Sequence, residues 1–168
     1  MKKTFSRLLL AFTLVGQTAA FVACSDHDYQ SLPPYFSDMT FTSLHGHSTL
    51  CAGDTILVTA VQSQLGRLLY KASYQWSTLD ETDSVSHKYC AYVVYDNDPS
   101  DPVDTIVFHR PGTYTVKLTA RYMMSGNFQN INDTQTFGTA GKATISTLSQ
   151  LQYGATVQNR VDIRPASN

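Results

Sequence analysis

The clearest structural signal in the chain is the stretch Pro111-Gly112-Thr113-Tyr114-Thr115-Val116-Lys117-Leu118-Thr119-Ala120-Arg121-Tyr122. Its Pro-Gly pair favours a turn. From Tyr114 onward, aromatic or aliphatic side chains alternate without a break with polar ones. Because successive side chains of a strand point to opposite faces of a sheet, the pattern predicts a strand over Tyr114–Tyr122 with one buried and one solvated face.

Segments on both sides show the same alternation, and none shows the periodicity of an amphipathic helix. The predicted strands, separated by turn signals, are Asp38–Leu44, Thr55–Val61, Tyr70–Thr78, Tyr89–Tyr95, Val103–Phe108 and Ala155–Arg164. Ten tyrosines and eight phenylalanines also favour strands. About seven short strands predict an all-β domain over residues 38–166, built as a two-sheet antiparallel sandwich.

The segment from about 123 to 152 is rich in Asn, Gln, Thr and Gly. We interpret it as a polar insertion that holds a small hairpin. Such a segment buries little apolar surface to offset the entropy lost on ordering, and loops on a rigid sandwich often carry recognition. We therefore expect a binding site, if the domain has one, on Met123–Gln152 rather than on the sheets.

Two motifs in the predicted domain resemble the PKD-type immunoglobulin-like domain. They are Tyr74-Gln75-Trp76 and the run from Arg110-Pro111-Gly112-Thr113 to Ala120. The resemblance implies an immunoglobulin-like sandwich, with Trp76 as the core indole and Tyr114 as the corner residue that locks the turn to its strand. The chain departs from that family where Ser77-Thr78-Leu79-Asp80 replaces the usual Gly-Asp, and where 123–152 exceeds a short hairpin.

The first 24 residues resemble a bacterial lipoprotein signal. Three basic residues precede the apolar run Leu8–Val15, and Phe21-Val22-Ala23-Cys24 closes the segment with small residues before a cysteine. The resemblance implies that residues 1–23 are removed and that Cys24 carries acyl chains such as palmitate. The alternative is an uncut anchor, but the interrupted apolar stretch is shorter than the roughly 20 residues of a spanning helix.

Residues 24–37 read as an extended tether, because they are polar and acidic and include Pro33-Pro34. The start of this segment, Cys24-Ser25-Asp26-His27-Asp28, resembles the export tag of Bacteroidota surface lipoproteins. That resemblance implies a location on the outer face of the outer membrane, with the periplasmic face as the alternative.

The net charge of the chain limits the classes of partner that we expect it to bind. It has 12 Lys+Arg and 13 Asp+Glu, and removing the three basic residues in segment 1–23 leaves nine against 13, a net charge of −4. Nucleic-acid binding depends on neutralising phosphates, so we expect no nucleic-acid partner. An acidic chain is not attracted to anionic lipid headgroups either, so we expect the lipid on Cys24, and not a basic surface, to link the protein to the membrane.

With Cys24 acylated, Cys51 and Cys90 remain as an even pair in an exported protein. A disulfide between them would close a loop of about 40 residues and contribute roughly 4 kcal/mol on the chain-entropy model. The alternative is two unpaired cysteines that pack as small hydrophobic residues.

Two clusters could in principle ligate a cation. An acidic loop offers hard oxygen ligands suited to Ca²⁺, and its carboxylates are Asp96, Asp98, Asp101 and Asp104. It lacks the glycine and glutamate of an EF-hand loop, and the same residues describe an ordinary soluble turn. His45 and His47 have no accompanying metal-binding motif and read as surface residues. We expect no cofactor.

The sequence has no Gly-x-Ser-x-Gly elbow and no cysteine in a recognisable catalytic context, so we expect no enzymatic activity. Aromatic residues flanked by amides favour carbohydrate or protein binding, and the candidates are Tyr89, Tyr92, Tyr95, Tyr122, Phe128 and Tyr153. The expected function is a non-catalytic binding or spacer module that assists glycan or protein capture. The alternatives are a structural subunit of an envelope or adhesin assembly and a small hydrolase with an unrecognised site.

Three triplets resemble the Asp-Ser/Thr-aliphatic acceptors of Bacteroidota O-glycosylation: Asp54-Thr55-Ile56, Asp83-Ser84-Val85 and Asp104-Thr105-Ile106. The resemblance implies glycosylation at Thr55, Ser84 and Thr105. Thr55 and Thr105 fall on the predicted outer faces of their strands, where a glycan could be attached.

Overall fold

A computed structural model of the chain describes residues 30–79, 85–87, 93–94 and 101–166. These residues form strands joined by turns and loops, and no helix. The strands are β1 (Tyr35–Ser43), β2 (Thr55–Gln64), β3 (Leu69–Thr78), β4 (Val85–His87), β5 (Val93–Val94), β6 (Val103–Phe108), β7 (Gly112–Met124), β8 (Asn132–Phe137), β9 (Gly141–Ser149) and β10 (Gln152–Ile163).

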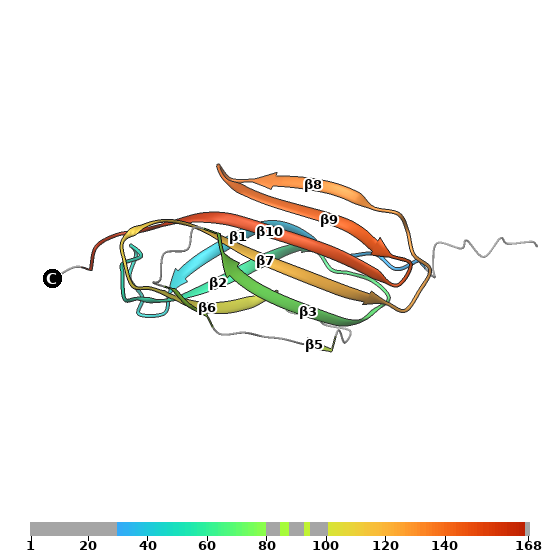
Figure 1. Cartoon of the computed structure of the whole chain (residues 1–168), viewed down its shortest axis with the longest axis horizontal. Helices are drawn as coiled ribbons and strands as arrows, with labels where there is room; N and C mark the ends of the chain where they lie inside the picture. The colour runs from blue at the N-terminus through green and yellow to red at the C-terminus, as the bar shows by residue number, and fades with distance from the viewer. Residues whose placement is uncertain (1–29, 80–84, 88–92, 95–100, 167–168) are drawn as a thin grey trace, which may run out of the picture.

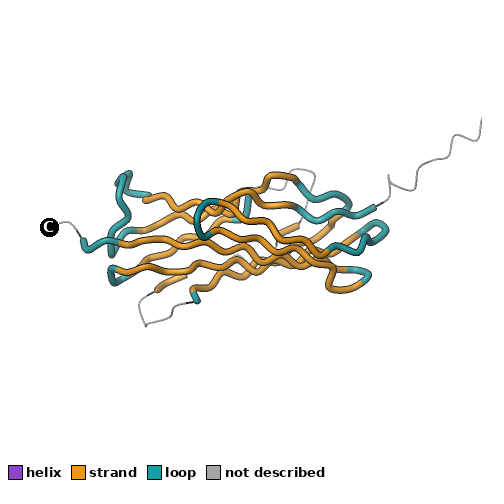
Figure 2. The backbone as a smooth tube through the Cα atoms, turned by 90° about the horizontal axis from the view of Figure 1, so that it is seen from above, coloured by secondary structure: helices purple, strands orange, loops and turns teal. Residues whose placement is uncertain are grey.

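The strands form two sheets. One has the order β1-β2-β6-β4 and the other the order β5-β3-β7-β10-β9-β8, with antiparallel neighbours throughout. The strands run along the long axis of the molecule, and the loops gather at its two ends (Figures 1 and 2). This arrangement confirms the all-β, two-sheet immunoglobulin-like sandwich expected from the alternating pattern.

The core lies between the two sheets and is built from the inward face of each strand. In β7 every second residue from Tyr114 to Met124 is buried, as the alternation predicts. The register places Leu118 of β7 between Trp76 of β3 and Val157 of β10, and all three side chains are fully buried. Ile56, Val58 and Ile106 of the other sheet belong to the same buried cluster.

Tyr114 anchors the turn before β7. Its hydroxyl donates a hydrogen bond of 2.9 Å to the carbonyl oxygen of Arg110, four residues upstream. Its ring packs at a tilt against Phe108 of β6, with 4.5 Å between the ring centroids. One side chain therefore ties the start of β7 to the end of β6, which is the corner role that the resemblance implied.

The tether predicted over 24–37 is wrong from residue 30 onward, because the described residues there belong to the domain. Ser31 is fully buried; its hydroxyl donates to the carbonyl of Leu68 at 2.8 Å and accepts from the amide of Gly126 at 2.9 Å. β1 begins at Tyr35 rather than at Asp38. Residues 24–29 lie outside the described chain.

The polar insertion predicted over 123–152 is also corrected. β7 runs on to Met124, and the anticipated hairpin, β8–β9, extends the six-stranded sheet instead of standing apart from it. β9 pairs with β10 and buries Ala143 and Ile145 completely. The segment looked like a loop because its two inward-facing apolar side chains are few and stand among Thr and Ser.

Candidate functional site

The outward face of the six-stranded sheet carries an ordered polar surface. Register places four threonines side by side on adjacent strands, in the order Thr119, Thr156, Thr144 and Thr134. Their side chains point away from the core, because the residues before and after each of them in β7, β9 and β10 are buried. The hydroxyls of Thr134 and Thr144 lie 3.4 Å apart.

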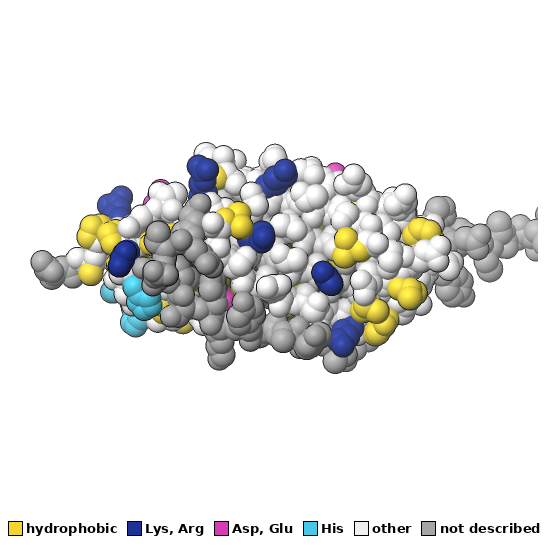
Figure 3. Space-filling model, in the orientation of Figure 1, with side chains coloured by type: hydrophobic (Ala, Val, Ile, Leu, Met, Phe, Trp, Pro, Cys, Tyr) yellow, Lys and Arg dark blue, Asp and Glu magenta, His cyan; other side chains and the backbone are white. Residues whose placement is uncertain are grey.

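This face is positively charged although the chain as a whole is not. Its outward positions hold the cations Lys71, Lys117, Arg121, Lys142 and Arg160. Among the described outward positions of β3, β7, β8, β9 and β10, the one carboxylate is Asp162, at the far end, where it accepts a 2.6 Å hydrogen bond from the hydroxyl of Thr113. Figure 3 shows Lys and Arg side chains spread over the visible face with little acidic surface between them.

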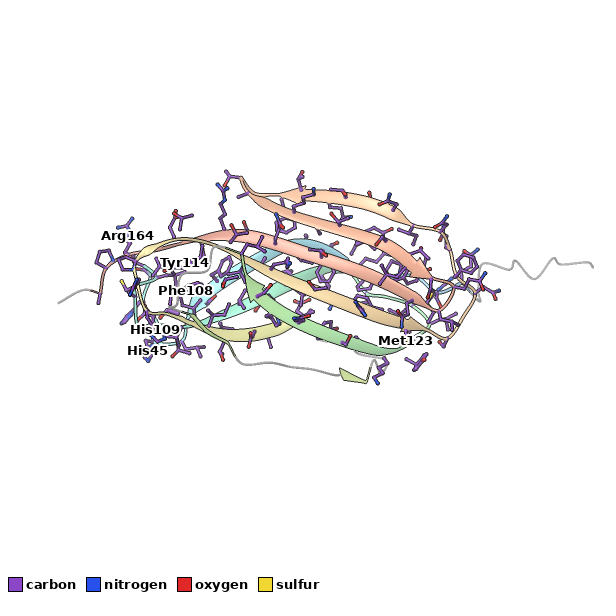
Figure 4. All side chains as sticks on the ribbon, viewed as in Figure 1. His45, Phe108, His109, Tyr114, Met123 and Arg164 are labelled. Atoms are coloured by element: carbon purple, nitrogen blue, oxygen red, sulfur yellow. The ribbon has the colours of Figure 1, made fainter. Side chains whose placement is uncertain are left out.

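Two hollows adjoin on this face and share Arg121. The first has a volume of about 310 Å³, and the residues that matter in it are Tyr70, Lys71, Ser73, Arg121, Met123 and Gln152. The second has a volume of about 180 Å³ and is lined by Thr119, Arg121, Thr144, Ser146, Gly154 and Thr156, among others. We call the two hollows together the Arg121 groove. Met123, labelled in Figure 4, marks the end of the sheet at which the groove lies.

Gly154 is one of the residues that line the second hollow. It stands between Arg121 of β7 and Ser146 of β9 at an outward position, where any other residue would raise a side chain. The side chain of Leu148 lies over it, so that a Cβ atom at position 154 would come within 2.9 Å of the Leu148 Cδ1 atom. The Leu148 side chain therefore fills the space above Gly154, and the rest of the second hollow is lined by hydroxyl-bearing residues together with Ala120 and Ala155.

The groove offers groups that suit an acidic carbohydrate. A guanidinium such as that of Arg121 pairs with carboxylate or sulfate through two parallel hydrogen bonds. Tyr70, which is 49% exposed, offers a ring with an apolar face at the edge of the first hollow. The described residues that line the groove include no Asp, Glu, His or Cys, the side chains that most often serve as catalytic acids, bases or nucleophiles.

A second polar cluster lies at the opposite end of the sandwich, where Figure 4 labels His45 and Arg164. His47 Nδ1 lies 3.2 Å from both carboxylate oxygens of Asp54, and the amide of Cys51 donates to Asp54 Oδ2 at 3.1 Å. The Cys51 amide and then the His47 ring hold the pKa of Asp54 below its ordinary value. His45 and His47 are exposed and stacked, and the described residues form no group of three or more metal-ligating side chains.

The candidate cation loop is only partly described. Asp96 and Asp98 lie outside the described residues. Asp101 accepts a 2.7 Å hydrogen bond from the amide of Gln62, and buried Asp104 accepts one of 2.8 Å from the amide of Thr105. Both described carboxylates thus accept hydrogen bonds from backbone amides, Asp101 from β2 and Asp104 from β6.

Only some of the candidate sites of covalent modification lie among the described residues. Cys24, Ser84 and Cys90 lie outside the described residues, so lipidation, the second glycosylation site and the Cys51–Cys90 disulfide stay predictions. Cys51 is half-buried, and its Sγ lies 3.8 Å from the carbonyl of Thr49. Thr55 and Thr105 are half-buried on the outward face of the four-stranded sheet, as expected for their strands.

Of the aromatic residues proposed for binding, two are core residues. Tyr122 and Tyr153 are fully buried, and the Tyr153 hydroxyl donates to the carbonyl of Ser31 at 2.7 Å. Phe128 is exposed, and Tyr89, Tyr92 and Tyr95 lie outside the described residues. The sequence did not reveal the groove, because the polar faces of β7, β9 and β10 align only once the strand register is known.

Comparison with known proteins adds no relative: no family model, no curated protein and no solved structure matches this chain. None of the described segments is a helix long and apolar enough to cross a membrane.

Proposed function

We propose that the chain is a lipid-anchored surface lipoprotein whose non-catalytic β-sandwich binds acidic polysaccharide in the Arg121 groove. The observation that carries the proposal is a cationic, hydroxyl-lined groove on a chain that is otherwise acidic. Partners with carboxylate or sulfate groups are attracted to that face and repelled by the rest of the mature chain. A neutral glycan would accept hydrogen bonds from these side chains but would gain no charge attraction.

Two observations support the proposed anchor: the lipoprotein-like first 24 residues and the position of Gln30 in the fold. Cys24 stands six residues before Gln30, the first described residue, and Gln30 is bridged to Asn127 at one end of the sandwich. A lipid on Cys24 would hold the domain by that end. We place the protein on the outer membrane facing the exterior, with the periplasmic face as the alternative, and protease digestion of intact cells separates the two.

The alternative function, a structural subunit joined through a sheet edge, is less well supported. β8 is the edge strand of the six-stranded sheet, and its described pairing is with β9. The Asp133 carboxylate accepts a 2.8 Å hydrogen bond from the amide of Thr134. That bond occupies one amide of β8, and the charged Asp133 on an edge strand disfavours strand addition.

The proposal is tested by presenting the full-length protein in detergent to immobilised polygalacturonate, heparin and the neutral polymer dextran. We expect retention on polygalacturonate or heparin and not on dextran. Retention should weaken as salt rises toward the range in which exposed charges are screened, about 0.15 M and above. Binding to dextran alone, or binding to the acidic polymers that does not respond to salt, would contradict the proposal.

A further inference from the structure

Exposed apolar side chains gather at one end of the sandwich. We call them the apolar tip: Leu65 (50% exposed), Leu68 (37%), Phe128 (44%) and Leu151 (64%). They come from the β2–β3, β7–β8 and β9–β10 connections, which meet at the same end of the long axis. Figure 3 shows hydrophobic surface at that end.

Hydrogen bonds hold these connections together with the first described residues. The carbonyl of Leu68 accepts bonds of 2.8 Å from the Ser31 hydroxyl and from the Ser125 amide. The Met124 amide donates to the carbonyl of Leu151 at 2.9 Å. Leu32 and Arg67 exchange backbone hydrogen bonds of 2.9 and 3.0 Å. The apolar tip is therefore a defined surface rather than a set of independent loops.

The backbone of Leu68 makes this surface unusual. Its φ of 52° lies in the left-handed region, which glycine adopts at less cost. No other non-glycine residue of the described chain has a positive φ. A strained position thus carries a large apolar side chain that remains more than one third exposed.

The length of chain before the domain indicates what covers this surface. Cys24 lies six residues before Gln30, a distance of at most about 20 Å when fully extended. A lipid attached there keeps the apolar tip within reach of the bilayer surface. The described residues of the three connections include Arg67 and no Asp or Glu, and the carboxylates that precede the domain in the sequence are Asp26 and Asp28, between Cys24 and Gln30. Leucine and phenylalanine beside a basic residue suit the headgroup–acyl boundary.

We propose that the apolar tip inserts into the membrane interface beside the lipid anchor, so that the sandwich is seated on the bilayer rather than swinging on a tether. The inference rests on the proposed lipidation of Cys24. In this pose the His45–Cys51 end points away from the membrane, and the outward face of the six-stranded sheet stands on the side of the molecule.

Tryptophan fluorescence tests the pose. The full-length lipidated protein with Phe128→Trp is reconstituted into vesicles of phosphatidylethanolamine and phosphatidylglycerol, with and without brominated acyl chains. Native Trp76 is fully buried in the core and gives a constant background. We expect the new tryptophan to lose emission in brominated vesicles, because apolar side chains at an interface reach the boundary between headgroups and acyl chains. Leu44→Trp, at the opposite end and 55% exposed, should lose none.

A second pair of variants tests whether the quenching at position 128 depends on the neighbouring leucines of the apolar tip. Adding Leu65→Ser and Leu151→Ser to the Phe128→Trp protein should remove most of the quenching, whereas Leu44→Ser with Leu79→Ser should leave it unchanged. All four leucines are exposed, so none of these changes should unfold the domain. Protein that floats with the vesicles yet shows equal quenching at 128 and 44 would overturn the seated pose while leaving the anchor intact. Protein that fails to float would refute the anchor and this inference with it.

Discussion

At the scale of single residues, Trp76 shows how much of the core depends on one side chain. Its indole is fully buried opposite Leu118, and its N–H finds no hydrogen-bond partner among the described residues. The ring therefore contributes through packing. We expect Trp76→Ala to lower the free energy of unfolding by about 3–5 kcal/mol, with Trp76→Phe costing less. Urea denaturation measures both, and an unchanged midpoint for Trp76→Ala would show that the indole is not in the core.

The Tyr114 hydroxyl makes a smaller contribution to the free energy of unfolding, and a single substitution can measure it. Tyr114→Phe keeps the ring against Phe108 and removes only the hydrogen bond to the Arg110 carbonyl. We expect a loss of about 1 kcal/mol in the free energy of unfolding. Tyr70→Phe, which removes an exposed hydroxyl, is the matched control and should stay within about 0.5 kcal/mol of the parent. Equal effects of the two substitutions on denaturation would contradict the corner role.

Asp54 links stability to pH. The Cys51 amide and the His47 ring lower the pKa of its carboxyl in the folded state, so the ionised form favours folding. This contribution is fully present above the ordinary pKa of about 4 and is lost as pH falls through the lower folded value. The gap in Tm between the parent and Asp54→Asn should therefore be present at pH 6 and shrink below pH 4. A gap that widens in acid would reverse the assigned direction.

At the scale of elements, β9 departs most from the structure that the sequence predicts. Strands β3, β7 and β10 could be predicted because their apolar side chains alternate with polar ones, and β2 and β6 because they are short runs rich in β-branched residues between turn signals. β9 offers Ala143 and Ile145 between Thr and Ser, and β8 turns mainly polar side chains to solvent. Their placement comes from pairing with β10, which is a tertiary effect. Residues 30–34 were likewise missed, because backbone and hydroxyl hydrogen bonds rather than apolar periodicity hold them.

The corrected role of the hairpin yields a prediction opposite to that for a dispensable loop. Replacing residues 125–151 with a short turn should unfold or strongly destabilise the domain, because it uncovers the edge of β10 and removes the buried side chains of β9. Within the intact hairpin, Ile145→Ala should cost about 2–5 kcal/mol, while Thr144→Ala on the outward face should cost less than about 0.5 kcal/mol. If the shortened protein had the same Tm as the parent, residues 125–151 would be a dispensable insertion, which contradicts our assignment.

At the scale of the whole molecule, we propose different roles for the two ends of the sandwich and for the outward face of the six-stranded sheet. In the proposed pose the end at Gln30 is held to the membrane, and the opposite end carries the His47–Asp54 pair. The outward face of the six-stranded sheet brings together Arg121, Lys71 and a row of threonines from strands far apart in sequence. The proposed location rests on the first 24 residues alone, whereas the proposed binding face could be recognised only from the strand register.

The account is tested most directly by comparing two charge-matched variants in their affinity for polygalacturonate or heparin, whichever the parent binds, by calorimetry. Arg121→Gln removes the cation shared by both hollows, and Arg110→Gln removes an exposed cation at the other end. A lost hydrogen bond to a charged group is worth about 1.5–3 kcal/mol, so Arg121→Gln should weaken binding about tenfold or more. Arg110→Gln should bind like the parent. Equal affinities of the two variants would contradict the assignment of the Arg121 groove as the binding site.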